Sequence, residues 1–507
     1  MNPLQAQERD GLTLTHHRVQ ANDAARARKG TIVFDPSVTA KTSLAECFRV
    51  FTSSAALSHE PGERLRRPVN GVALQHEHLD IYTDGSCEHN GKRNARCGAG
   101  VWVSDNHALN RAFRVPGAAQ TNNVGELAAV LLVARDAPPF APLTIHTDSE
   151  YVIRGFTEHL PRWEDAGFIG VKNADLWRSA AHRIRARSAA AGFRWVKGHS
   201  GDTGNDHADA QAALGAAKAT ADSLDLTVPP PFQLSGAKMS TLTQSLAYQG
   251  IRERKQAKVV PRNGTNARME AARYALRDVT GQDEPDSALW LSLRCKDIRK
   301  NIQAFMFRAL HRSHKVGEYW RNAQIPDWQD CAMCDGELES LEHILFTCQR
   351  SAPTTIIWQL ARDLWPHDPG LWPPYSLGSV LAAGALCTPA PDGEAQERPP
   401  APPPGPSRLL RILVSESAHM IWVLRCERVI GGRRHTPQQI VSRWRRAILD
   451  RLVTDRITAC KIIRTGAARS LVAKTWAGTL ADEGQVPDNW AKCPEVLVGI
   501  RPSRIPF

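Results

Sequence analysis

The sequence predicts an α/β protein, in which a mixed sheet with helices on its faces is followed by a helical region. Short apolar runs rich in β-branched and aromatic residues begin at Leu79 and are typical of strands. Segments with apolar residues at helical spacing alternate with these runs as far as Ala219. Beyond two proline-rich stretches the patterning is helical alone, so the sheet is confined to the first half of the chain.

Five strands and four helices are predicted within the α/β segment. The strands are expected at residues 79–84, 98–104, 111–117, 143–149 and 193–199, separated by turns that contain Gly or Asn. The helices are expected at residues 126–137, 149–160, 175–191 and 205–219, and the first of them ends before a proline. Three strands, a helix, a strand, two helices, a strand and a helix predict a mixed five-stranded sheet with flanking helices.

Changes in composition divide the 507 residues into six segments. A polar, partly disordered lead-in covers residues 1–76, and the α/β domain covers residues 77–220. A basic linker is expected at 221–285, a small cysteine-containing module at 286–380, a proline-rich linker at 381–407 and a basic helical region at 408–507.

The net charge of +12 is unevenly distributed. Residues 79–218 hold 16 Lys and Arg against 15 Asp and Glu, whereas residues 407–507 hold 18 against 8. The basic excess therefore lies in the C-terminal half, where it favours a polyanion such as nucleic acid. A solvated basic helix surface is the alternative, and Arg443 and Arg446 could serve either nucleic acid or packing.

The sequence favours an intracellular protein of the nucleus or cytoplasm with no membrane segment. No apolar run reaches the ~18 residues that a membrane span needs, and the N-terminal residues lack the pattern of a secretory signal. The cysteines number eleven, which is too few for a disulfide scaffold. In a reducing compartment, clustered cysteines indicate metal ligands.

Four carboxylates fall where a ligand crevice is expected. Asp84 and Asp148 end predicted strands, Glu126 opens a helix and Asp209 lies in the last helix of the domain. Carboxyl ends of neighbouring strands line such crevices, and converging carboxylates repel each other unless cations neutralise them. A helix cap or turn explains Asp84 and Asp148 poorly, because each ends an apolar strand. Their oxygens suit two Mg²⁺ or Mn²⁺ ions, the arrangement used for phosphodiester hydrolysis.

Residues 79–218 resemble a type 1 ribonuclease H domain. The motifs that carry the resemblance are TDGSC with Asp84, TNN-x-x-E with Asn122, Asn123 and Glu126, TDSEYV with Asp148, VKNADLW, and WVKGHSG with His199 ahead of Asn205 and Asp209. The resemblance implies a ribonuclease H-like fold and a two-metal endonuclease. Such an enzyme cuts the RNA strand of an RNA–DNA hybrid and leaves 3′-hydroxyl and 5′-phosphate ends.

The resemblance also implies a role for each carboxylate. Asp84 would bridge two ions, and Asp209 would help to hold the ion that activates the attacking water. Glu126 and Asp148 would hold the ion at the leaving 3′ oxygen. Glu126 would also lie close to a ribose 2′-hydroxyl, the group that distinguishes RNA from DNA.

Further residues match substrate-handling positions of the family. Asn90, Thr121 and Asn123 match positions that touch the backbone and minor groove of the hybrid. His199, on a Gly-flanked loop, would shuttle a proton or help to release product, although without the motif a surface histidine is the simpler interpretation.

Three features depart from the family pattern. Glu150 puts a charge where the family commonly has an amide, the glycine-rich turn within 85–100 is longer and more basic, and the basic protrusion is shortened to 163–173 with Glu164 and Asp165. The domain is nearly neutral, so hybrid affinity is expected to come from the basic regions downstream.

A second metal site is predicted at Cys331, Cys334, His343 and Cys348. A CxxC followed by a His and a Cys can close a tetrahedral, structural Zn²⁺ site, whereas the alternative is unpaired cysteines beside a core histidine. Residues 295–360 resemble the zinc-binding region found downstream of reverse transcriptases in non-LTR retroelements. No YxDD-type polymerase motif is present.

The sequence is compatible with three functions. The leading one is a hybrid-cutting ribonuclease H. The second is a catalytically weak or inactive retroelement-derived protein that binds nucleic acid without cutting it, which the presence of all four carboxylates disfavours. The third is a DNA nuclease of the same fold, such as an integrase, which TDGSC and VKGHSG at these spacings disfavour.

Overall fold

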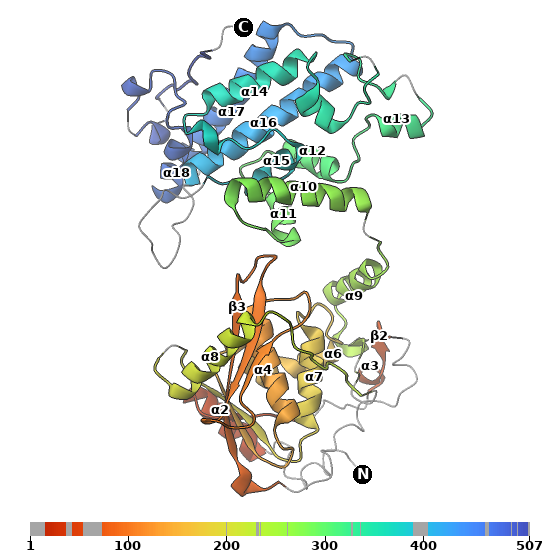
Figure 1. The fold of residues 1–507 in the computed structure, drawn as a ribbon, viewed down its shortest axis with the longest axis vertical. Coiled ribbons are helices and arrows are strands. Elements are labelled where there is room, and N and C mark those ends of the chain that lie inside the picture. The colour runs from red at the N-terminus through yellow and green to blue at the C-terminus, as the bar shows by residue number, and fades with distance from the viewer. Residues whose placement is uncertain are drawn as a thin grey trace. The chain divides into compact units, whose positions relative to one another are not determined.

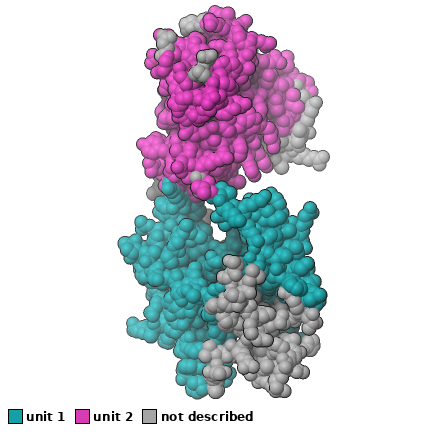
Figure 2. Space-filling view, turned by 90° about the vertical axis from the view of Figure 1, so that its right-hand side faces the viewer, with its two compact units in different colours: residues 1–259 teal, residues 260–507 magenta. Residues whose placement is uncertain are grey.

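The protein is described from a computed structural model (Figure 1). The described residues are 16–36, 43–53, 73–198, 200–229, 233, 235–260, 262–325, 328–334, 336–388, 404–461, 466–487, 489–493 and 495–504. The chain divides into two compact units, residues 1–259 and residues 260–507 (Figure 2). Each has a hydrophobic core of its own. Among the described helices, none combines the length and the apolar content needed to cross a bilayer.

The first unit is built on a six-stranded mixed sheet with the order β1-β7-β6-β3-β4-β5. The strands are β1 (Ile32–Val33), β3 (Leu79–Glu88), β4 (Arg96–Trp102), β5 (Arg111–Arg114), β6 (Leu143–Thr147) and β7 (Ala191–Trp195). β3, β4 and β5 form an antiparallel meander, whereas β3, β6 and β7 are parallel. The predicted mixed α/β sheet of ribonuclease H-like type is therefore confirmed.

The sheet carries one strand more than the five expected. β1 pairs antiparallel with β7 at the sheet edge, and its Val33 exchanges two 2.9 Å hydrogen bonds with the Asn22 side chain of α2 (His16–Ala27). Two residues are too few to show a periodic pattern, so this strand lies hidden in the expected lead-in. Residues 1–15 of that lead-in are outside the described residues.

Helices cover both faces of the sheet. They are α4 (Asn122–Asp136), α5 (Glu150–Arg154), a π-helical turn (Gly155–His159), α6 (Leu160–Asp165), α7 (Ala174–Arg185) and α8 (Thr203–Ala217). α4 meets the sheet where β3 has Gly85, and α8 meets it where β4 has Gly98 and Gly100. Gly85 is paired with Ala99, and neighbouring residues of a strand alternate in direction, so α4 and α8 lie on opposite faces.

The expected basic linker at 221–285 contains regular structure. β8 (Ala237–Lys238) pairs with β2 (Arg49–Val50), which follows the short helix α3 (Leu44–Cys47). α9 (Gln244–Gln256) ends the first unit and α10 (Asn263–Thr280) begins the second. Met269, Ala272 and Leu276 of α10 are buried in the core of the second unit, so this segment is part of a packed domain.

The second unit is helical and has one core. Its helices are α10, α11 (Asp286–Ser292), α12 (Lys300–Leu310), α13 (Glu318–Asn322), α14 (Ala352–Leu364), α15 (Leu377–Leu381), α16 (Pro404–Val429), α17 (Pro437–Lys461) and α18 (Gly466–Trp476). α16 is central, because consecutive residues on all of its sides, Leu409 to Leu413 among them, are mostly buried. The cysteine-containing module and the C-terminal helical region, expected as separate domains, share this core. Residues 389–403 of the proline-rich linker lie outside the described residues.

Several arginines of the basic C-terminal region form ion pairs inside the second unit. Arg408 Nη1 lies 2.6 Å from Asp455, and its Nε lies 2.9 Å from Asp297. Arg443 pairs with Glu427, which selects the packing role for this arginine over the nucleic-acid role. These guanidinium groups neutralise partly buried carboxylates and are not free to bind phosphate.

Candidate active site

Adjacent parallel strands bring the first two predicted carboxylates together. β3 and β6 pair from Leu79 with Leu143 to Tyr82 with His146. Asp84 and Asp148 each lie two residues beyond the last of these pairs, so the same register places them side by side. β3 does not end at Asp84 as expected, because it continues to Glu88 in its pairing with β4. Asp84 is therefore held within a strand, whereas Asp148 follows one.

Glu126 reaches the same point from α4. The helix begins at Asn122, earlier than predicted, because the Thr121 hydroxyl caps it by accepting a hydrogen bond from the Val124 amide at 3.3 Å. Only a glycine fits beneath this turn, since a Cβ on Gly85 would lie 2.2 Å from the Glu126 backbone nitrogen. The close approach places the Glu126 side chain over the end of the sheet.

The three carboxylates form a compact group. Asp84, Glu126 and Asp148 each offer an oxygen, and these oxygens lie within 4.8 Å of one another. Asp84 is 7% exposed and Glu126 is 8% exposed. Oε2 of Glu126 is buried and has no hydrogen-bond partner among the described residues. A buried carboxylate oxygen without a donor is what a cation site requires.

The electrostatics of the group favour a bound cation. Burial, and then the charge of Asp148, raises the pKa of Asp84 to about 7, although the Gly85 amide donates a 2.6 Å hydrogen bond to it. Burial and the nearby Asp84 raise the pKa of Glu126 well above its usual value. A divalent cation at this point would stabilise the ionised form of each group.

Asp209 lies near this group but outside it. Its carboxylate is not among those within 4.8 Å of one another, although its charge contributes to the raised pKa of Asp84. It is half-buried on α8, whose backbone lies directly against β4. A Cβ on Gly100 would lie 2.0 Å from the carbonyl oxygen of Ala208, the residue before Asp209. The position of Asp209 therefore depends on a contact between two backbones.

The predicted substrate-binding residues are exposed to solvent. Thr121 and Asn123 stand at the start of α4 and are exposed, and Asn90 is exposed in the turn after β3. His199 lies outside the described residues.

The acidic residues that depart from the family pattern are neutralised. Glu150 Oε2 lies 2.8 Å from Arg154, one helical turn further along. Glu164 is buried and forms a bidentate ion pair with Arg185. Asp165 pairs with Lys238 of β8 at 2.7 Å. Glu164 and Asp165 therefore stabilise the fold of the first unit and do not present free charge to a polyanion.

The predicted zinc ligands come together in the second unit. Cys331, Cys334, His343 and Cys348 offer ligand atoms within 4.8 Å of one another. The Cys348 sulfur lies 3.8 Å from that of Cys331 and 3.6 Å from that of Cys334. Ligands ~2.3 Å from a tetrahedral Zn²⁺ would be ~3.8 Å apart, so the spacing fits this ion. Burial and the neighbouring thiols raise the pKa of Cys348 to about 12, which a bound cation would reverse.

Three residues that support this cluster were not predicted. Glu337 Oε2 lies 2.7 Å from Nδ1 of His343, and Nε2 of that imidazole is buried without a hydrogen-bond partner among the described residues. A carboxylate on one ring nitrogen and a metal on the other is a common arrangement at zinc sites. Glu339 forms a buried ion pair with Arg425 of α16, which ties the cluster to the helical core. Glu337 lies inside the motif and could have been noticed, but a partner 86 residues away gives no local signal.

Comparisons with known proteins agree with the site in the first unit. The family described as RNase H matches residues 76–217 and does not extend to the Cys/His cluster. Ribonuclease H of Albidiferax ferrireducens is 36% identical over 146 residues, which are 27% of this chain and 93% of that protein. Ribonuclease H of Schizosaccharomyces pombe is 37% identical over 143 residues, and the match spans 27% of this chain and 53% of that protein.

Solved structures are similar as well, and one of them is a ribonuclease H. The crystal structure of LC9-RNase H1, a type 1 RNase H with the type 2 active-site motif, matches 34% of this chain and 84% of that chain. The sequence identity is 25% and the TM-score is 0.24.

The family match and the relative covered over nine tenths of its length coincide with the domain that holds the three carboxylates. The chain belongs to the ribonuclease H family, the hydrolases that cut the RNA strand of RNA–DNA hybrids.

Proposed function

We propose that this chain hydrolyses the RNA strand of RNA–DNA hybrids in a reaction that requires divalent cations, with Asp84, Glu126, Asp148 and Asp209 as metal ligands. The observation that carries the proposal is the buried, unpartnered oxygen of Glu126 beside two further carboxylates. Family membership supports the activity, and the oxygen-only ligand set supports Mg²⁺ or Mn²⁺.

Each carboxylate would have its own role at the site. Asp84 would contact both ions, whereas Glu126 and Asp148 would hold the ion nearer the leaving 3′ oxygen. Asp209, on the far side in α8, would help to position the attacking water. Two bound Mg²⁺ ions would supply a nucleophile at neutral pH and stabilise the charge on the leaving oxygen, giving 3′-hydroxyl and 5′-phosphate ends.

Substrate contacts would come from the exposed rim of the site. Asn90, Thr121 and Asn123 are exposed and would offer amide and hydroxyl donors to the backbone of the hybrid. Glu126 would accept a hydrogen bond from a ribose 2′-hydroxyl, which selects RNA. His199 would assist proton transfer or release of product.

Cleavage assays on three duplexes test the proposal. Purified full-length protein is incubated with an RNA–DNA hybrid, double-stranded RNA and double-stranded DNA, with Mg²⁺ and with EDTA. We expect cleavage of the hybrid alone, only with Mg²⁺, and a loss of at least ~100-fold in Asp148→Asn. Asp105→Asn, an exposed carboxylate between β4 and β5, is the matched control and should cleave normally.

Two outcomes would replace the proposal. Hybrid binding without cleavage by the wild-type chain would mean an inactive nucleic-acid-binding protein. Equal cleavage of double-stranded DNA would mean a DNA nuclease of the same fold.

We also infer that Cys331, Cys334, His343 and Cys348 hold a structural Zn²⁺, in a module of the type found downstream of reverse transcriptases. The sulfur spacing and the unpartnered Nε2 of His343 support the ion. Metal analysis of the purified chain should give about one zinc per molecule, and Cys348→Ser should lose it. Cys460→Ser, at a half-buried cysteine outside the cluster, should keep the zinc. A wild-type chain without zinc would contradict this inference.

A further inference from the structure

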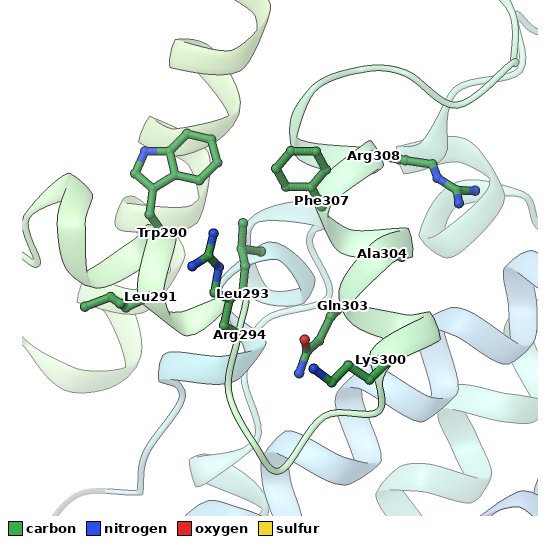
Figure 3. A pocket seen from close by; sticks show the side chains of 9 residues that line it. All are labelled: Trp290, Leu291, Leu293, Arg294, Lys300, Gln303, Ala304, Phe307 and Arg308. Carbon is green, nitrogen blue, oxygen red and sulfur yellow. The ribbon is translucent and has the colours of Figure 1, made fainter. Parts of the chain in front are cut away.

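A hollow of about 630 Å³ lies in the second unit between α11 and α12 (Figure 3). Its lining combines two aromatic rings, Trp290 and Phe307, with three cations, Arg294, Lys300 and Arg308. It is neither part of the acidic site in the first unit nor part of the Cys/His cluster.

The hollow is lined by a face of α12 that does not pack into the hydrophobic core. Positions 300, 303, 304, 307 and 308 follow one another at helical spacing and line the hollow. The opposite stripe, which includes Ile302, Phe305 and Met306, is buried in the core. Phe307 is 51% exposed and Leu291 on α11 is 68% exposed. Exposed large apolar side chains that gather at one hollow, unlike single ones scattered over the surface, are typical of a binding groove.

Aromatic contacts hold the rings of the hollow in place. The His311 ring lies 5.5 Å from that of Trp290 and 4.5 Å from that of Phe307, between centroids. Burial and the charge of Arg262 lower the pKa of His311, so this ring is neutral at neutral pH. Figure 3 shows Trp290 on α11 and Phe307 on α12, on opposite sides of the opening. The ring faces are therefore presented by two helices at fixed positions.

The loop between the two helices is also fixed. The Gln303 side-chain amide donates hydrogen bonds of 2.9 Å to the backbone carbonyls of Cys295 and Ile298. These bonds tie the loop that ends α11 to the first turns of α12. The hollow is thus a built feature of the fold and keeps its shape without a ligand.

The charged side chains that line the hollow are all positive. Within the described part of the chain, no carboxylate forms an ion pair with Arg294, Lys300 or Arg308. Other arginines of the same unit, such as Arg408 and Arg425, are neutralised by buried acids. Three unneutralised cations around two aromatic rings complement a ligand that carries both negative charge and flat rings.

We propose that this hollow binds unpaired nucleotides of a single-stranded nucleic acid. A base would stack on Phe307 or Trp290, while the adjacent phosphates would contact Arg294, Lys300 and Arg308. A duplex fits less well, because its bases are already stacked and their faces are hidden. The proposal concerns binding alone and does not depend on cleavage by the first unit.

Fluorescence anisotropy with labelled oligothymidylate of 15 nucleotides tests the proposal. This probe contains no ribose, so a ribonuclease H does not cut it. Phe307→Ala in the full-length chain should weaken binding by about tenfold, the range found when one base loses a stacking partner. Arg294→Ala and Lys300→Ala should each reduce the slope of log affinity against log salt by about 0.7.

Matched variants distinguish binding in the hollow from binding elsewhere on the protein surface. Tyr274→Ala removes an exposed ring on α10, and Arg433→Ala removes an exposed cation after α16, and neither residue lines the hollow. Both variants should bind like the wild type. Thermal melting should show that Phe307→Ala stays folded, because this side chain is half exposed.

The proposal is overturned if the hollow variants bind oligothymidylate like the wild type. It is overturned as well if Phe307→Ala weakens binding of double-stranded DNA equally, which would exclude stacking on an unpaired base. Competition by an oligoglutamate peptide as strong as by oligothymidylate would assign the hollow to an acidic protein partner. Hybrid cleavage measured in parallel reports separately on the function of the first unit.

Discussion

Asp84 and Glu126 are ionisable groups that the fold holds in an unfavourable environment for their charged forms. Their carboxyl groups are buried and close to each other and to Asp148. In the metal-free chain, ionisation of these groups is therefore easier in the unfolded state than in the folded one. The stability of the first unit should depend on pH and on divalent cations.

The pKa of Asp84 is about 7 in the folded chain, against an ordinary value of 3.8. Its contribution to stability is thus present below pH ~4 and is lost as the pH rises through 7. We expect the metal-free melting temperature of the first unit to fall by about 5 °C more between pH 5 and pH 8 in the wild type than in Asp84→Asn. Millimolar Mg²⁺ at pH 8 should raise the melting temperature of the wild type back toward its value at pH 5. It should leave the melting temperature of Asp84→Asn unchanged. Differential scanning fluorimetry in EDTA and in Mg²⁺ measures both effects, and parallel curves for the two proteins would contradict the assignment.

Glu126 allows a second test at the same scale. Glu126→Gln keeps the shape of the side chain but replaces a buried ionisable group of the cluster with one that cannot ionise. We expect the metal-free protein to be stabilised by ~1 kcal/mol at pH 8, with hybrid cleavage lost. Urea unfolding at pH 8 and at pH 5 measures the gain, which should shrink at the lower pH, because a raised pKa in the folded state costs the wild type more stability as the pH rises. If the variant were less stable than the wild type at pH 8, the Glu126 carboxyl group would not be destabilising to the fold.

Among the elements, α8 is the one whose placement decides the site, because it carries Asp209 and touches β4 backbone to backbone. Gly98 and Gly100 leave no room for a Cβ, since the nearest carbonyl oxygens would lie 2.0 Å away. Gly100→Ala should displace the helix, destabilise the first unit by ~2 kcal/mol and raise the Mg²⁺ concentration needed for half-maximal cleavage. Gly30→Ala meets only contacts of 3.5 Å and longer and serves as the control. Unchanged Mg²⁺ dependence in Gly100→Ala would mean that Asp209 does not hold an ion.

At this scale the sequence predicted those elements whose pattern is long and regular. The strand with Asp84, the strand that precedes Asp148 and the helix with Glu126 alternate or repeat over enough residues to be recognised, and their order gives the sheet. β1 was missed because two residues show no period. α10 was expected within a linker because Arg268, Arg273 and Arg277 give it a basic composition that hides a buried stripe of Met269, Ala272 and Leu276.

The candidate sites were predictable to the extent that their residues are close in sequence. The Cys/His spacing lies within one short segment, and the four carboxylates belong to recognisable motifs. The ion pair of Glu339 with Arg425 and the hollow between α11 and α12 depend on tertiary packing, which leaves no local pattern. The ion pairs of the acidic residues that depart from the family pattern, such as that of Glu164 with Arg185, also depend on tertiary packing.

At the scale of the whole molecule, two separate hydrophobic cores predict two separate unfolding transitions. A substitution in one unit should then shift the transition of that unit alone. The Cys/His cluster belongs to the second unit, where Leu341, Ile344 and Leu345 beside the ligands join its core. Cys348→Ser should lower the melting temperature of one calorimetric transition by about 10 °C and leave the other in place. Hybrid cleavage per molecule should stay within about twofold of the wild type at 25 °C. A single merged transition that shifts as a whole would show that the units do not unfold independently.

The contact of α8 with β4 also sets how the enzyme should respond to heat. Where side chains separate a helix from a sheet, they can rearrange gradually, and spacing drifts as temperature rises. Here a carbonyl of the helix lies against strand glycines, so no compressible layer exists to absorb a partial displacement. The distance from Asp209 to the strand carboxylates should hold nearly constant until the helix detaches altogether. Heat inactivation should then be abrupt, with activity rising normally up to the melting point of the first unit and vanishing within a few degrees of it.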